Sequence, residues 1–124
     1  YLISKGLLKP PYYVNLLLGN IACAQADLIN VGLMLRELPK DTHWSLAGIG
    51  NYQLQMNSLG IVWGGGVRVG LEDNIFLDTP TRKVLATNTQ MVERVVNLAK
   101  EYGREIATPR EVREWLGLRS PEEI

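Results

Sequence analysis

Three charged side chains, Arg68, Glu72 and Asp73, lie within one short stretch of the sequence. Arg68 belongs to the run Val67–Leu71, whose regularly spaced valines are typical of a β-strand. The two carboxylates follow directly, at the carboxyl end of this predicted strand. Parallel α/β proteins bind their ligands at the carboxyl ends of strands, so the stretch is a candidate site.

The two-residue period of a strand places Arg68, Gly70 and Glu72 on one face and the apolar residues on the other. In extended backbone the Cα atoms of Arg68 and Glu72 would lie ~13 Å apart. Burying an arginine and two carboxylates costs free energy unless the charges are paired or bind a metal. This cost favours a functional site. The alternative is a structural ion pair between Arg68 and Asp73, with Glu72 in solvent.

The other residues that could bind a metal are isolated in the sequence. His43 is the only histidine, and it starts a predicted strand, away from the carboxyl end, so we expect a capping or surface role. Cys23 is the only cysteine and is expected to be a small buried side chain. A zinc site usually needs three protein ligands. Glu72 cannot build one alone, so a metal here would need ligands from outside this chain.

A second candidate site is the glycine-rich turn that contains Gly48, Gly50 and Asn51. It follows a predicted strand and opens a helix, where exposed backbone N–H groups favour anions. It could bind a phosphate of a substrate, and the alternative is a tight turn with no ligand. The glycines Gly64–Gly66 join a helix to a strand and do not fit G-x-G-x-x-G, so they are not a nucleotide loop.

Hydrophobic periodicity, prolines and glycines divide the chain into alternating strands and helices. We predict strands at Tyr12–Leu18, His43–Ile49 and Val67–Leu71, and helices at Ala26–Leu38, Tyr52–Val62, Asn88–Tyr102 and from Pro109 to a stop at Gly117. The last helix has the clearest start, because Thr108 can cap it, Pro109 suits its first position and Glu111 completes a capping box.

This order of elements predicts an α/β protein with a parallel sheet. Three strands cannot close a barrel, so they form either a small open sheet or the last part of a TIM (β/α)8 barrel, which takes about 250 residues. The chain starts at Tyr1 rather than at a methionine. We therefore expect residues 1–124 to be the C-terminal part of a single TIM-barrel domain: its last three βα units and a terminal helix, with the N-terminal half absent.

Composition excludes some classes of partner. Lys plus Arg and Asp plus Glu both number 13, so the net charge is zero. A nucleic-acid groove or an anionic membrane surface would leave a basic footprint. No apolar run approaches the ~18 residues of a membrane helix, and no signal peptide is visible. A single cysteine cannot form an intrachain disulfide, which suits the reducing cytoplasm.

Four segments in order resemble one family. They are Trp44–Gly50, Gly64–Asn74, Ala86–Asn88 and Ala107–Leu118. The run Val-Arg-Val-Gly-Leu-Glu-Asp-Asn in the second segment is the most specific. Over Tyr12–Leu118 the chain resembles the β-keto acid cleavage enzymes, whose best-known type is the 3-keto-5-aminohexanoate cleavage enzyme of lysine fermentation.

The resemblance implies a TIM barrel and a reaction that condenses a β-keto acid with acetyl-CoA to give acetoacetate and a new acyl-CoA. It implies a zinc ion that binds the keto acid, held by two histidines of an early strand and by Glu72. It also implies that Asp73 is the catalytic acid or base and that Arg68 keeps Asp73 ionised and oriented.

The two zinc histidines have no counterpart in these residues, so we expect the fragment alone to be inactive. One alternative is another TIM-barrel enzyme that uses the same strand end for a different metal or a phosphorylated substrate. A non-enzymatic alternative is a half-barrel that only self-associates. Open sheet edges and an exposed inner face would in any case favour homo-oligomers.

Overall fold

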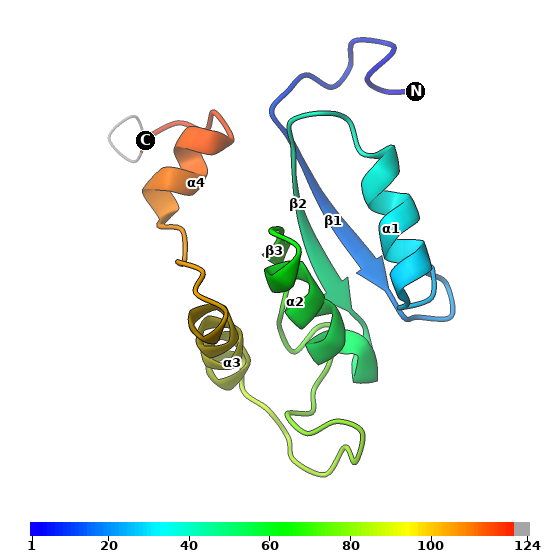
Figure 1. The fold of residues 1–124 in the computed structure, drawn as a ribbon, viewed down its shortest axis with the longest axis vertical. Helices are drawn as coiled ribbons and strands as arrows, with labels where there is room; N and C mark the ends of the chain where they lie inside the picture. Colours follow the sequence, from blue (N-terminus) through cyan, green and yellow to red (C-terminus); the bar gives the residue numbers. More distant parts are fainter. Residues whose placement is uncertain (121–124) are drawn as a thin grey trace.

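The computed structural model describes residues 1–120, which form a three-stranded parallel sheet with helices packed against it (Figure 1). The elements in chain order are β1 (Tyr12–Leu18), α1 (Leu28–Glu37), β2 (Thr42–Gly48), the 3₁₀-helix η1 (Gly50–Tyr52), α2 (Gln53–Val62), β3 (Gly66–Val67), α3 (Asn88–Glu101) and α4 (Pro109–Trp115). The prediction of a parallel α/β fold is confirmed. The complete barrel stays a prediction.

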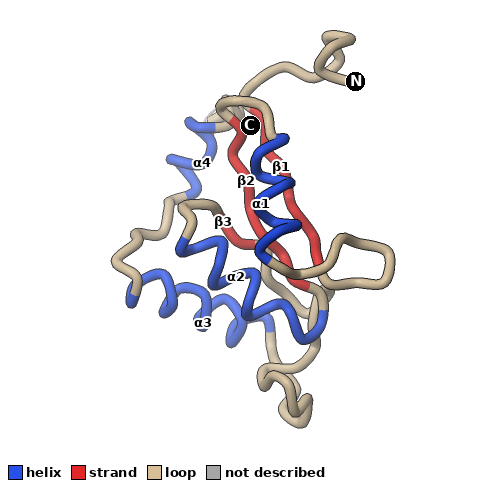
Figure 2. Tube along the Cα trace, turned by 45° about the vertical axis from the view of Figure 1, so that its right-hand side comes forward, coloured by secondary structure: helices blue, strands red, loops and turns tan. Residues whose placement is uncertain are grey.

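The sheet has the strand order β1-β2-β3, and its two pairings differ greatly in length (Figure 2). β1 and β2 pair along all seven residues, from Tyr12 opposite Thr42 to Leu18 opposite Gly48. β3 pairs with β2 at only two positions. The carboxyl ends of β1 and β2 lie at the same end of the molecule as the long connection between β3 and α3 (Figure 1).

Two apolar clusters hold the helices against the sheet. The larger consists of the buried residues Leu16, Leu18, Val31, Leu46 and Met56, contributed by β1, β2, α1 and α2. The smaller consists of Ile61, Val95 and Ala99, with Val67 and Val69 packed against it. The first cluster thus anchors the two long strands, and the second joins α2, α3 and the short strand.

Side-chain caps set the starts of three helices. Asp27 accepts the Asn30 N–H at 2.8 Å, so α1 begins at Leu28 and not at Ala26 as predicted. This hydrogen bond is also the main cause that lowers the pKa of Asp27. The predicted capping box of α4 is confirmed, and α3 has a second capping box that was not predicted.

The third predicted strand is wrong in its extent. Extended pairing stops at Val67, whereas the sequence pattern predicted a strand through Leu71. One more sheet-like bond follows, from the Arg68 N–H to the Leu46 carbonyl at 3.0 Å, and the chain then turns at Gly70. Strand β2 was predicted one residue too late at each end, and β1 was predicted with its observed bounds. Within residues 1–120, no helix combines the length and hydropathy that crossing a membrane requires.

Candidate active site

The candidate site lies on the tight turn that follows β3. The Gly70 carbonyl accepts the N–H groups of Asp73 and Asn74 at 3.2 and 3.3 Å, which closes the turn. The Asp73 carbonyl accepts the Gly50 N–H at 2.8 Å, which ties the turn to the segment after β2. Asn74 stabilises the exit from the turn, because its side chain both accepts from and donates to the backbone of Phe76.

Arg68 and Asp73 form a forked ion pair within this turn. The Arg68 Nε donates to Asp73 Oδ2 and Nη2 donates to Oδ1, both at 3.0 Å. The Asp73 side chain is only 4% exposed, so the ion pair forms where little solvent reaches the carboxylate. The hydrogen bonds to Asp73, followed by the attraction of its charge, raise the pKa of the Arg68 guanidinium. Both side chains are therefore oriented as a unit.

Glu72 contacts the same arginine but lies in solvent. Its Oε2 is 3.1 Å from Arg68 Nη2, and its side chain is 84% exposed. The extended arrangement predicted from alternation, with Arg68 and Glu72 far apart, is wrong because the turn at Gly70 folds both carboxylates back toward the guanidinium. The ion pair between Arg68 and Asp73, considered above as a purely structural feature, does form.

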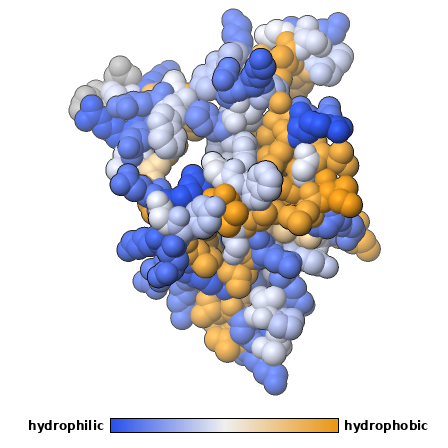
Figure 3. All heavy atoms as spheres, viewed as in Figure 1, coloured by the Kyte–Doolittle hydropathy of each residue, from blue (hydrophilic) through white to orange (hydrophobic). Residues whose placement is uncertain are grey.

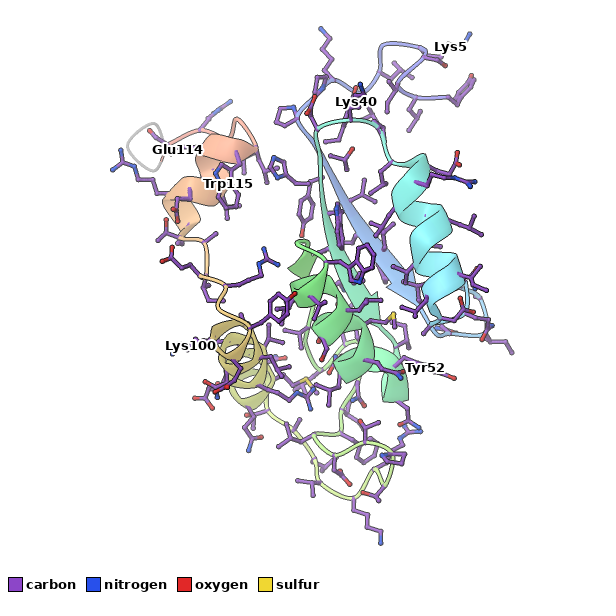
Figure 4. The ribbon with its side chains drawn as sticks, in the orientation of Figure 1. Lys5, Lys40, Tyr52, Lys100, Glu114 and Trp115 are labelled. Carbon is purple, nitrogen blue, oxygen red and sulfur yellow. The ribbon has the colours of Figure 1, made fainter. Side chains whose placement is uncertain are left out.

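The predicted phosphate-binding residues lie next to this turn. Gly50 has φ +59°, and its N–H is used by the Asp73 carbonyl. At Gly48 an added Cβ would lie 2.1 Å from the Tyr52 carbonyl oxygen, so only glycine fits where β2 bends into α2. Tyr52 lies at this bend (Figure 4). The geometry of Gly48, Gly50 and Asn51 is that of a tight turn, and phosphate binding there stays a prediction.

The other metal-binding residue types lie elsewhere. His43 is at the start of β2 and stacks on Trp115 of α4, with ring centroids 6.0 Å apart and planes 6° apart. Trp115 lies on the side of α4 that faces the strands (Figure 4). In the described part of the chain, no three side chains of His, Cys, Asp or Glu gather into a group that could hold a metal ion. Glu72 therefore belongs to no such group within residues 1–120.

Several amide side chains around the turn were missed from the sequence. Gln53 and Asn57 of α2 are fully buried and contact the backbone of the segment that carries the ion pair. Asn88, the first residue of α3, accepts the Leu71 N–H at 3.0 Å. Gln53 and Asn57 are four residues apart and so share one face of α2, but this helix also contains Gln55 and Ser58, and the spacing alone does not show which polar side chains are buried.

A parallel α/β unit with an arginine–carboxylate pair and an accessible glutamate just beyond its strands has the arrangement of an α/β enzyme. The chain belongs to the beta-keto acid cleavage enzyme family, whose model matches residues 1–118. The resemblance inferred from the sequence motifs is thereby confirmed.

Curated relatives are similar to this chain over most of its length. The 3-keto-5-aminohexanoate cleavage enzyme of Fusobacterium nucleatum subsp. nucleatum is 44% identical over 118 residues, covering 94% of this chain and 41% of the relative. The protein of the same name from Acetoanaerobium sticklandii is 35% identical over 122 residues, covering 94% and 42%. The 3-oxoadipate:acetyl-CoA acetyltransferase of Cupriavidus necator is 44% identical over 88 residues, covering 71% and 30%. The chain spans about two fifths of the length of the first two relatives.

Proposed function

We propose that this chain is the C-terminal part of a longer β-keto acid cleavage enzyme, built as a single TIM-barrel domain. The whole enzyme condenses a β-keto acid with acetyl-CoA and releases acetoacetate and a new acyl-CoA. Family membership and the names of the relatives support this reaction class. The observation that carries the proposal is the forked pair of Arg68 and Asp73 with Glu72 beside it, on the turn that follows a parallel strand.

Asp73 is the proposed acid or base. A carboxylate oxygen has two lone-pair positions, so each Asp73 oxygen that accepts one bond from Arg68 retains a second position for a substrate proton. The fork prevents the carboxylate from rotating, which keeps that position in a constant direction. Arg68 thus orients Asp73 and balances its charge while the proton moves to and from an Asp73 carboxylate oxygen.

Glu72 is the proposed ligand of a zinc ion. Its 84% exposed side chain can reach a metal held mainly by residues outside this chain, and its contact with Arg68 directs the carboxylate. Zinc suits a carboxylate oxygen combined with two histidine nitrogens, and when bound it would polarise the carbonyl group of the keto acid. The two further ligands belong to the N-terminal half.

The turn with Gly48, Gly50 and Asn51 is proposed to lie near a phosphate of coenzyme A, because the bond from Gly50 to Asp73 places this turn next to the acid or base. Self-association is also part of the proposal. Hydrophobic residues gather over α1 (Figure 3), where Leu28 and Ile29 are 70% and 75% exposed. The proposal includes a cytoplasmic location and no nucleic-acid or membrane partner, on the basis of the zero net charge and the single cysteine.

The test uses the full-length polypeptide that carries this sequence. Supplied with acetyl-CoA and a panel of β-keto acids, the enzyme should form acetoacetate from at least one of them. The variant Asp73→Asn should lower kcat by about 10²- to 10⁴-fold, the usual contribution of a general acid or base. Asp41→Asn, an exposed carboxylate in the turn before β2, is the matched control and should leave kcat unchanged.

Zinc analysis of the same proteins tests the ligand. Glu72→Ala should lower the zinc content, whereas Glu93→Ala on the exposed side of α3 should not. Unchanged zinc in Glu72→Ala contradicts the assignment of this ligand. If no β-keto acid yields acetoacetate, the second candidate is favoured: another barrel enzyme that uses this strand end for a different metal or a phosphorylated substrate.

A further inference from the structure

The backbone that carries Arg68 and Asp73 receives little support from the sheet. Strand β3 has two residues, and beyond it the sheet contributes a single bond, from the Arg68 N–H to the Leu46 carbonyl. Strands normally place functional side chains through their ladder of backbone bonds. Other groups must therefore hold the segment 68–74 in position.

Two buried amides of α2 supply this support. The Asn57 Nδ2 donates to the Arg68 carbonyl at 2.8 Å and to the Leu46 carbonyl at 3.3 Å. The Gln53 Nε2 donates to the Gly70 carbonyl at 2.9 Å. Both side chains are 0% exposed. Residues four apart on a helix project from the same face, so Gln53 and Asn57 both point toward the segment 68–74. There they bond two carbonyls that are two residues apart in the sequence, those of Gly70 and Arg68.

The carbonyl that Gln53 contacts is the one that closes the turn. Gly70 also accepts the N–H groups of Asp73 and Asn74, so its carbonyl sets the position of Asp73 relative to Arg68. Gln53 is itself oriented, because its Oε1 accepts from Arg94 Nη2 at 3.3 Å. Arg94 Nη1 donates to the Leu77 carbonyl at 2.7 Å, which extends the support to the connection after the turn.

We propose that Gln53 and Asn57 are positioning residues, which hold the carbonyls of Gly70 and Arg68 so that the Arg68 guanidinium and the Asp73 carboxylate meet in the reactive geometry. This inference rests on the proposed function. A merely structural role would be to satisfy buried polar groups while α2 packs on the sheet. The distinguishing feature is that the bonds of both amides reach the segment that bears the ion pair.

The experiment replaces each amide by an apolar side chain of similar size in the full-length enzyme. Gln53→Met and Asn57→Leu should each lower kcat by about 10- to 100-fold, since misplacement of a catalytic group by about 1 Å has effects of this order. The KM for acetyl-CoA should stay within about twofold, as expected when the interaction lost matters mainly in the transition state. Ser58→Ala is the matched control, because the Ser58 hydroxyl bonds only the Leu54 carbonyl of its own helix in the described structure, and it should not change kcat.

A second kinetic readout separates positioning from general loss of stability. If Gln53 acts through the ion pair, the losses caused by Gln53→Met and by Arg68→Lys should not multiply in the double variant, because both act on the same arrangement. Losses that multiply, or a kcat within about twofold of wild type in both single variants, would overturn the proposal.

Amide hydrogen exchange gives a readout that does not require turnover. Gln53→Met should increase exchange at the N–H groups of Asp73 and Asn74 at least tenfold and leave the amides of β1 unchanged. If wild type makes no acetoacetate, this result still tests the inference while the proposed function fails. If Gln53→Met does not fold, Gln53→Glu replaces it, since this variant keeps the acceptor for Arg94 but removes the donor to Gly70. Exchange that rises equally in β1 and in the turn would show that the role is structural only.

Discussion

The pair of strands β1 and β2 and the turn 68–74 are adjacent in space but are stabilised in different ways. The two strands share seven pairs of residues in register and bury Leu16, Leu18 and Leu46 against the helices. The turn has almost no sheet pairing, and of its residues only Val69 packs against one of the two apolar clusters. Its backbone is held by the side chains of Gln53, Asn57 and Asn88 and by the N–H of Gly50.

This difference separates stability from placement. Regular pairing and apolar packing are spread over many residues, so they determine whether the sheet forms at all. A hydrogen bond from a buried amide to one carbonyl contributes only modestly to stability but determines where that carbonyl lies. Substitutions in the strands should therefore reduce the amount of folded protein, and substitutions around the turn should reduce the activity of each folded molecule.

The largest effect on stability is expected for Leu46→Ala in β2. Leu46 is 0% exposed at the centre of the larger cluster, and removing a buried leucine side chain typically costs about 2–5 kcal/mol. Urea denaturation of the full-length protein should show this loss, with kcat per folded molecule unchanged. Val92→Ala, at a half-exposed position of α3, is the control and should change stability little. A large fall in kcat with normal stability would contradict the separation proposed here.

The corresponding change at the turn is Arg68→Met. It leaves the Asp73 carboxylate without the fork that orients it, so kcat should fall by about 100-fold or more. Arg68→Lys should recover only part of this loss, because an ammonium group cannot reproduce two parallel N–H bonds. Arg110→Met removes an exposed arginine that pairs with Glu114 on α4 and should have no effect on steady-state rates. Equal activity of Arg68→Lys and wild type would mean that the fork has no catalytic role.

The same contrast explains what the sequence could predict. Strand β1 was predicted with its observed bounds because Pro11 precedes an apolar run and Gly19 ends it, so local signals coincide with the sheet. The start of α4 was predicted because a capping box depends on residues three apart. The third strand was predicted too long, because alternation continues through Leu71, whereas pairing with β2 stops at Val67 although β2 itself continues to Gly48. The alternation of residue types indicates only which residues could pair in a sheet. It does not indicate the turn at Gly70, because that turn depends on a contact with Gln53 of α2.

The sequence was enough to locate the candidate site but not to predict the contacts between its side chains. Residue types and position identified Arg68, Glu72 and Asp73, yet only the folded turn shows that one guanidinium contacts both carboxylates. Gln53 and Asn57 were overlooked because, in a helical pattern, a buried amide cannot be told from a solvated one. Their role depends on a backbone segment more than ten residues away in the chain.

The smallest effect is expected in the connection 75–87, where one carboxylate organises the backbone. Asp78 accepts the Thr81 hydroxyl and the N–H groups of Lys83 and Val84, and these bonds, that of Thr81 first, lower the pKa of Asp78 from 3.8 to about 2. A lowered pKa stabilises the folded connection above about pH 4, and this contribution is lost as the pH falls toward 2. Protection of the Lys83 and Val84 amides from hydrogen exchange, corrected for intrinsic rates, should decline over that interval. In Asp78→Asn it should be lower and nearly independent of pH, whereas Asp41→Asn should behave as wild type. A decline in Asp78→Asn that matches wild type would assign the pH dependence to another group, and the connection would then depend on packing in the way that β1 and β2 do.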